Sequence, residues 1–131
     1  MTKLALLISE NEGFGGVGNI PTRDNNPGDL RHSPHSSHAG EGPNGIGEID
    51  TVADGWADLE RELQRYATRT ITTDPMTLKP CAPRRMTMQD MAYTWAPPAD
   101  GNPTAAYLAT LCRGLGMPDT TLVADALKVQ A

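Results

Sequence analysis

One apolar stripe constrains the fold of this chain more than any other feature of its sequence. Its large apolar side chains recur at alternating intervals of 4 and 3 residues, and they are Val52, Trp56, Leu59, Leu63 and Tyr66. This spacing places all of them on one face of an α-helix that begins after Thr51, with Asp54 as the third residue after this cap. Because such a face must be buried against other elements, we predict a core helix in the middle of the chain.

Capping residues predict four further helices. Their expected starts are Thr2, Thr87, Asn102 and Asp119. A glycine or a proline ends the first three of these segments, at Gly13, at Pro97-Pro98, and at Gly114 with Gly116. The first helix is therefore expected to run from residue 2 to about Glu12 and the last to be short.

Two regions are predicted to be irregular. Residues 13–50 contain most of the 13 glycines and no helical period, so we expect loop with short strands around residues 46–49. A disordered linker is the alternative for this region. Residues 70–85 contain three prolines and are predicted to be an irregular excursion. With 131 residues, the chain is predicted to be a single, mainly α domain of the α+β class, residues 1–131.

Charge and hydropathy exclude several functions. The net charge is -5, and residues 1–60 carry 10 acidic against 3 basic side chains, which argues against a nucleic-acid partner. The basic face, if the chain has one, is expected from Arg61, Arg65, Arg69, Arg84 and Arg85. No apolar run approaches the roughly 20 residues that cross a bilayer, and residues 1–8 lack the features of a signal peptide. We therefore expect that the chain does not insert into a membrane. If it acts outside the cell membrane, we expect another agent to deliver it there. Cys81 and Cys112 permit one disulfide, but free thiols are the prediction.

Glu12 is the main candidate for a catalytic residue. It lies in the last turn of the first predicted helix, where the negative end of the helix dipole tends to raise the pKa of a carboxyl group. The neighbouring Phe14 offers apolar surface that would exclude water. Glu10 is the rival, but it points about 200° around the helix axis from Glu12. A protonated carboxyl of this kind suits the cleavage of a glycosidic bond, although a solvated residue at a fraying helix end is the simpler alternative.

Three segments resemble a group of phage and prophage proteins with a lysozyme-like or lytic-transglycosylase-like domain. The first is Glu12-Gly13-Phe14, followed by Asn25-Asn26-Pro27-Gly28-Asp29-Leu30-Arg31, where Asp29 replaces a common Asn. The others are residues 45–49 with Gly55-Trp56, and residues 93–104 with Tyr107. The resemblance covers nearly the whole chain, and the Asn-Asn-Pro-Gly loop is its specific part.

This resemblance implies a lysozyme-like fold, with a helical lobe and a small irregular β/loop lobe on the two sides of a glycan cleft. It implies cleavage of the β-1,4 bond between the two peptidoglycan sugars by a muramidase or a lytic transglycosylase, with Glu12 as general acid/base and no cofactor. Expected partners are peptidoglycan glycan strands and other virion proteins, and the expected location is a phage virion or the host cell. A catalytically inactive virion structural or cell-wall-binding module with the same fold is the alternative.

The remaining candidate residues would contact the substrate. Asn25, Asn26 and Arg31 would bind N-acetyl groups or the peptide-bearing ether, with turn scaffolding as an equal alternative. The resemblance implies that Glu48 stands where lytic transglycosylases carry a cleft-lining glutamine. The aromatic platform would consist of Tyr93, Trp95 and Tyr107. Trp56 is interpreted as a core residue.

Candidates for a second carboxylate, which would favour hydrolysis, are Asp24, Asp29, Glu48 and Asp50. His32, His35 and His38 lack partners at metal-binding spacing, so we predict a polar loop and no metal site.

Overall fold

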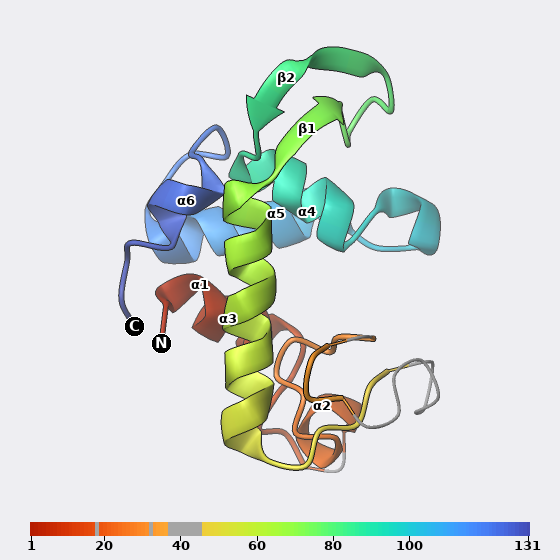
Figure 1. The fold of residues 1–131 in the computed structure, drawn as a ribbon, viewed down its shortest axis with the longest axis vertical. Coiled ribbons are helices and arrows are strands. Elements are labelled where there is room, and N and C mark those ends of the chain that lie inside the picture. Colours follow the sequence, from red (N-terminus) through yellow and green to blue (C-terminus); the bar gives the residue numbers. More distant parts are fainter. Residues whose placement is uncertain (18, 32, 37–45) are drawn as a thin grey trace. The chain divides into compact units, whose positions relative to one another are not determined.

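The computed structural model describes residues 1–17, 19–31, 33–36 and 46–131. In this part of the chain, α-helices combine with one small two-stranded antiparallel sheet, in agreement with the predicted α+β class. The chain divides into two compact units, Met1–Glu62 with Ala131, and Leu63–Gln130. Figure 1 follows the elements from α1 in red to α6 in blue.

The first unit begins with the predicted helix. Helix α1 is Lys3–Asn11, and the hydroxyl of Thr2 caps it by accepting a hydrogen bond from the backbone N–H of Ala5 at 3.2 Å. Leu4 and Ile8 on this helix are completely buried and form part of the unit's core. The backbone N–H of Thr2 also donates to Glu60 Oε1 at 2.7 Å, which fixes the start of α1 to α3.

A second, short helix lies in the region that we predicted to be loop. Helix α2 is Ile20–Arg23, and Asn19 caps it by accepting a hydrogen bond from the N–H of Thr22 at 3.2 Å. The predicted strand near residues 46–49 is reduced to one antiparallel bridge between Ser36 and Ile49. Asn19 followed by an early Pro21 is a typical helix start, so the sequence did contain a signal for α2.

Helix α3 is the predicted core helix, Val52–Thr68. The hydroxyl of Thr51 accepts a hydrogen bond from the N–H of Asp54 at 3.2 Å, as the capping pattern predicts. Leu59 and Leu63 are completely buried, but Val52 is 45% exposed. The predicted core helix is therefore buried at Leu59 and Leu63, while its apolar stripe reaches solvent in the first turn.

A β-hairpin replaces the irregular excursion that we predicted for residues 70–85. Strand β1 is Thr70–Thr73 and strand β2 is Pro80–Arg85, and they pair antiparallel with Ile71 opposite Arg84. The hairpin follows directly on the last turn of α3 (Figure 1). Both strands of a two-stranded sheet are edge strands, so prolines without an N–H are tolerated where that group would face away from the partner.

The helices of the second unit follow the predicted order. Helix α4 is Met88–Trp95, and Thr87 and Asp90 form the predicted capping box. Helix α5 is Thr104–Leu115 and ends at Gly116 with a φ of 68°, a left-handed conformation that suits glycine. The predicted cap Asn102 is wrong, because Pro103 is the N-cap and the Asn102 amide donates instead to the carbonyl of Pro97 at 3.1 Å. Gly114 lies inside α5.

The last helix starts later than predicted. Helix α6 is Val123–Ala126 with Leu122 as its N-cap, so Asp119 does not cap it. The backbone carbonyl of Asp119 instead accepts a hydrogen bond from the N–H of Gln89 at 3.0 Å. A short 3-10 helix, η2, occupies Pro98–Asp100.

The core of the second unit is rich in methionine, with Met86, Met88 and Met91 almost completely buried. Cys81 and Cys112 carry free thiols, as predicted. Among the described residues, no helix is both long enough and apolar enough to cross a membrane.

Candidate functional site

Glu12 lies where α1 ends, and the end is a Schellman motif. Glu12 is the C-cap and is half-buried, and Gly13 follows it in the left-handed region with a φ of 82°. The N–H of Phe14 donates to the carbonyl of Ser9 at 2.9 Å, and the N–H of Gly13 donates to that of Glu10 at 3.1 Å. These are the two bonds that define the motif, so the Glu-Gly-Phe sequence fixes the backbone at Glu12.

An aromatic pair lies next to this helix end. The ring of Phe14 meets the ring of Trp56 on α3 edge to face, with centroids 5.5 Å apart. Both side chains are half-buried, so Trp56 packs against Phe14 but is not the buried core residue that we predicted. The pair provides apolar surface within two residues of Glu12. Glu10, the rival carboxylate, is exposed on α1.

The side chains of Asn25 and Asn26 hold the polar loop together. The amide of Asn26 is completely buried; its nitrogen donates to the carbonyls of Leu30 at 2.7 Å and Gly47 at 3.0 Å, and its oxygen accepts from the N–H of Leu30 at 2.9 Å. The amide of Asn25 donates to the carbonyl of Ile49 at 2.9 Å. These contacts are those of turn scaffolding, and direct contact of either residue with a substrate stays a prediction.

The same loop packs very closely on α3. A Cβ atom placed on Gly55 would lie 1.9 Å from the carbonyl oxygen of Asn25 and 2.8 Å from the ring of Pro27. A Cβ atom on Gly28 would lie 2.7 Å from the side chain of Leu59. Glycine is therefore required at position 55, where the close atom belongs to the backbone, whereas a Cβ atom at position 28 would require the Leu59 side chain to move. The loop that carries Asn25 and Asn26 is held close to the helix at this contact.

Four carboxylates were candidates for a second catalytic group. Asp24 is 5% exposed, Asp29 and Glu48 are half-buried, and Asp50 is exposed. Burial raises the pKa of the Asp29 carboxyl, the charge of Asp24 raises it further, and Arg31 acts in the opposite direction. Asp24, Asp29 and Arg31 are therefore electrostatic neighbours.

Glu48 and Arg31 are also brought to this loop. Glu48 lies between Gly47 and Ile49, whose carbonyls accept the hydrogen bonds from the two asparagines. The N–H of Gly47 donates to the carbonyl of Leu30 at 2.9 Å, next to the exposed Arg31. The first unit thus brings four predicted substrate-binding residues into one loop layer: Asn25, Asn26, Arg31 and Glu48.

The three residues of the predicted aromatic platform, Tyr93, Trp95 and Tyr107, lie in the second unit. Tyr107 is 7% exposed, so a sugar ring would reach it only after neighbouring side chains moved. Trp95 meets the ring of Tyr66 with centroids 5.8 Å apart. Tyr93 lines a cavity of about 390 Å³. The other lining residues come mainly from α4 and α5: Gln89, Ala105, Leu108, Ala109, Cys112 and Asp119. Burial, and then the charge of Asp119, raises the pKa of the Cys112 thiol.

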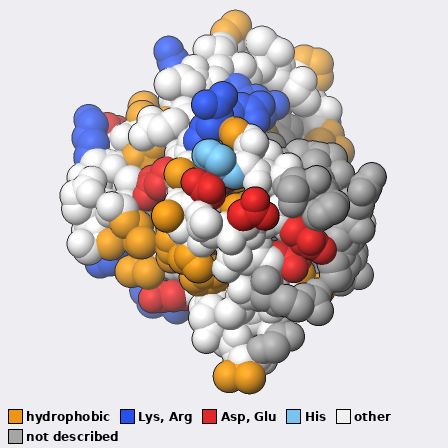
Figure 2. Space-filling view, turned by 60° about the horizontal axis from the view of Figure 1, so that its bottom comes forward, with side chains coloured by type: hydrophobic (Ala, Val, Ile, Leu, Met, Phe, Trp, Pro, Cys, Tyr) orange, Lys and Arg blue, Asp and Glu red, His pale blue; other side chains and the backbone are white. Residues whose placement is uncertain are grey.

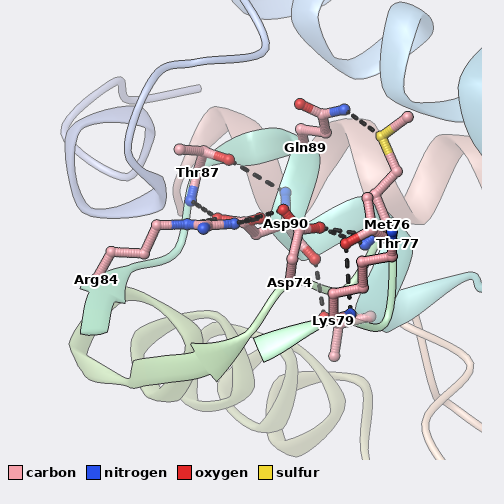
Figure 3. A network of polar contacts seen from close by, with 9 residues as sticks. Asp74, Met76, Thr77, Lys79, Arg84, Thr87, Gln89 and Asp90 are labelled. Atoms are coloured by element: carbon pink, nitrogen blue, oxygen red, sulfur yellow. Dashed lines mark hydrogen bonds and ion pairs between the residues drawn. The ribbon is translucent and has the colours of Figure 1, made fainter. Parts of the chain in front are cut away.

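A second cavity, of about 300 Å³, borders an ion-pair network at the hairpin. The guanidinium of Arg84 lies 2.8 Å from Asp90 Oδ1 and 3.3 Å from Asp74 Oδ2 (Figure 3). Asp74 lies in the hairpin turn and accepts hydrogen bonds from the N–H groups of Met76 and Thr77. The network joins β2 to the capping box of α4. The charge of Arg84 is thus paired with Asp74 and Asp90, and Arg84 does not contribute an unpaired charge to the predicted basic face.

His35 has a partner that the sequence analysis missed. Its Nδ1 lies 2.6 Å from Asp58 Oδ1, and its Nε2 lies 3.7 Å from Asp54 Oδ1. The described residues contain no group of three or more side chains that could hold a metal ion. The predictions for His32 and His38 lie outside the described residues.

The chain was compared with known proteins by family, by sequence and by structure. No protein-family model, no curated protein and no solved structure matches it.

Proposed function

We propose that this chain is a glycan-cleaving peptidoglycan enzyme, a muramidase or a lytic transglycosylase, with Glu12 as its general acid/base. The observation that carries the proposal is the position of Glu12. Its carboxyl group belongs to a half-buried residue whose backbone is fixed by the Schellman motif, beside the Phe14–Trp56 pair. A carboxyl group at a rigid helix end, near apolar surface, suits proton donation to a leaving oxygen.

In the proposed reaction, the protonated Glu12 gives its proton to the glycosidic oxygen while the bond to the sugar carbon breaks. Positive charge develops on that carbon in the transition state. The Glu12 carboxylate that remains then takes a proton from the incoming nucleophile. This nucleophile is water in a muramidase and the sugar's own 6-hydroxyl in a lytic transglycosylase, in which an anhydro ring forms.

A second carboxylate would favour hydrolysis, because it stabilises the sugar cation or positions water. Asp24 and Asp29 lie in the loop layer of the first unit with Asn25 and Asn26. Burial raises the pKa of Asp29 and so favours its neutral form, which makes Asp29 a weaker choice for an ionised group.

The other parts of the proposal rest on the resemblance to phage and prophage proteins. They are a lysozyme-like fold with a glycan cleft, a virion or host-cell location, other virion proteins as partners, and no cofactor. In this scheme Arg31 and Glu48 contact the glycan strand from the loop layer of the first unit.

One observation favours a second candidate, a virion structural or cell-wall-binding module without turnover. The amide of Asn26 is saturated by backbone groups, and that of Asn25 bonds to the Ile49 carbonyl. Asn25 and Asn26 belong to the specific part of the resemblance, and their side chains stabilise the loop itself. This arrangement is also compatible with a protein that has the fold but serves in binding or assembly.

Product analysis distinguishes these functions. Purified peptidoglycan is incubated with the protein, and the soluble fragments are identified by mass spectrometry. An enzyme releases fragments, with reducing ends from a muramidase and anhydro ends from a lytic transglycosylase. If the protein sediments with the peptidoglycan but releases no fragments, the enzyme proposal is wrong and the binding module is favoured.

A further inference from the structure

A close polar contact joins residues 33–36 to helix α3 within the first unit. Asp58 on α3 accepts two hydrogen bonds from one residue, His35: the backbone N–H donates to Oδ2 at 3.0 Å, and ring atom Nδ1 lies 2.6 Å from Oδ1. Both carboxylate oxygens are thus occupied by His35, and the loop backbone and the ring are fixed together.

The two partners differ in their access to solvent. The Asp58 side chain is 1% exposed, whereas that of His35 is 48% exposed. A buried carboxylate requires compensation by hydrogen bonds or an opposite charge. His35 can exchange protons with solvent while it provides this compensation. Figure 2 shows a histidine, in pale blue, at the surface against acidic side chains, and His35 is the one histidine in the described ranges.

The surroundings favour the protonated ring. The hydrogen bond to Asp58 raises the pKa of His35; the charges of Asp58 and Asp54 add to this rise, while some desolvation and Arg61 oppose it. Burial alone would raise the pKa of Asp58, but the nearby Ser33 hydroxyl and the hydrogen bonds from His35 lower it below its usual value. Among the described residues, the charged groups with the largest effect on His35 are Asp54, Asp58 and Arg61, which lie on α3.

We propose that His35 and Asp58 form a pH-dependent clasp, which holds residues 33–36 on α3 while the His35 ring is charged and loosens when the ring loses its proton. The clasp is connected to the loop layer of the candidate site through Ser36 and Ile49. Ser36 forms the antiparallel bridge with Ile49, and the Ile49 carbonyl accepts the hydrogen bond from Asn25. The proposal concerns loop order and does not depend on the proposed function.

The pH range follows from the two pKa directions. The pKa of His35 is raised in the folded state, so its stabilisation is complete below the ordinary histidine value of about 6.5 and is lost as the pH rises through the folded value. The pKa of Asp58 is lowered, so its stabilisation is present above the ordinary value of about 3.9 and is lost as the pH falls through the folded value. The clasp is therefore strongest in weakly acidic solution.

An NMR titration of the histidine rings tests the charge coupling. The His35 signals are assigned by their absence in His35→Gln. We expect the wild-type ring to titrate above 6.5, the Asp58→Asn ring to titrate at a lower pH, and Asp54→Asn to have a smaller effect in the same direction. Asp50→Asn, an exposed control outside the clasp, should change nothing. A wild-type His35 that titrates at or below its ordinary value overturns the proposal.

Amide hydrogen exchange tests the loosening of the loop. Exchange rates are divided by the intrinsic rate at each pH, so only structural protection remains. Protection of the N–H groups of His35 and Ser36 should fall as the pH rises through the His35 pKa, by about tenfold for each unit by which that pKa is raised. In His35→Gln the protection should be low at every pH in this range. Wild-type protection that does not change across the titration overturns the clasp, even if the pKa is raised.

Discussion

The carbonyl oxygen of Asn25 lies so close to Gly55 that a Cβ atom on residue 55 would be 1.9 Å away. Real Cβ atoms do not approach a backbone oxygen to this distance, so the contact requires glycine in the first turn of α3. A glycine inside a helix costs about 1 kcal/mol relative to alanine. The lower helix propensity of glycine is therefore present at the position where the polar loop contacts the core helix.

Gly55→Ala should therefore lower stability, although alanine is the better helix former. Displacement of the loop should cost about 1–3 kcal/mol, the usual range for overpacking, and this exceeds the helix-propensity gain. The free energy of unfolding in urea measures the effect. Ala57→Gly, at an exposed position on the same helix, calibrates the propensity term. A Gly55→Ala protein that is more stable than wild type would show that the contact is not tight.

Asn26→Ala should be among the most destabilising changes in the first unit. It removes three hydrogen bonds and leaves the buried carbonyl of Gly47 without its partner, for a cost of roughly 2–4 kcal/mol. Thermal or urea unfolding measures it. Asn102→Ala, which removes one hydrogen bond at an exposed residue, is the control and should cost at most about 1 kcal/mol. Equal effects of the two changes would contradict the scaffolding role of Asn26.

Asp29→Asn should increase stability at neutral pH. The folded-state pKa of Asp29 is raised by burial and by Asp24, so the ionised carboxyl destabilises the fold above that pKa. This cost is relieved as the pH falls through the folded value and is absent below the ordinary value of about 3.9. Asparagine also tolerates the left-handed backbone of residue 29, which has a φ of 51°.

The gain from Asp29→Asn should accordingly be present at pH 7 and vanish in acid, where the wild-type carboxyl is neutral. Unfolding in urea at several pH values follows this difference. Asp50→Asn, at an exposed carboxylate, should show little change at any pH. Loss of stability in Asp29→Asn at pH 7 would mean that the Asp29 charge is stabilised by Arg31 more than it is penalised by burial.

Arg84→Met should lower the melting temperature by loosening the hairpin. It removes the ion pairs with Asp74 and Asp90 and leaves the buried Asp90 carboxylate with fewer partners. Arg85→Met is the matched control, because the exposed Arg85 side chain donates to the carbonyl of Thr68 and, among the described residues, forms no ion pair with a carboxylate. Thermal unfolding should show the larger loss for Arg84→Met. A larger loss for Arg85→Met would contradict the role assigned to the network.

Local signals made much of the fold predictable. Thr2, Thr51 and Thr87 each cap a helix at the predicted residue, because a capping hydrogen bond depends only on the next three residues. The hairpin was not predicted, because its prolines suggest irregular chain and only strand pairing shows that they are tolerated at an edge.

The candidate site was less predictable than the fold. The position of Glu12 at a helix end followed from Gly13, and the loop residues were recognised by their composition. Their hydrogen bonds were not, because the amides of Asn25 and Asn26 reach residues 24 and 21 positions away. The His35–Asp58 pair, separated by 23 residues, also carries no local signal, since neither residue has a motif around it.

The most direct test of the central claim is the release of soluble fragments from purified peptidoglycan by wild type, Glu12→Gln and Glu10→Gln. Glutamine keeps the size of each side chain but cannot exchange a proton, and Glu10 lies exposed on the same helix. Loss of general acid/base catalysis should reduce release by Glu12→Gln by at least about 10²-fold, while Glu10→Gln should remain close to wild type. Equal activity of Glu12→Gln and wild type, with both variants folded, would contradict the assignment of Glu12 as the catalytic acid.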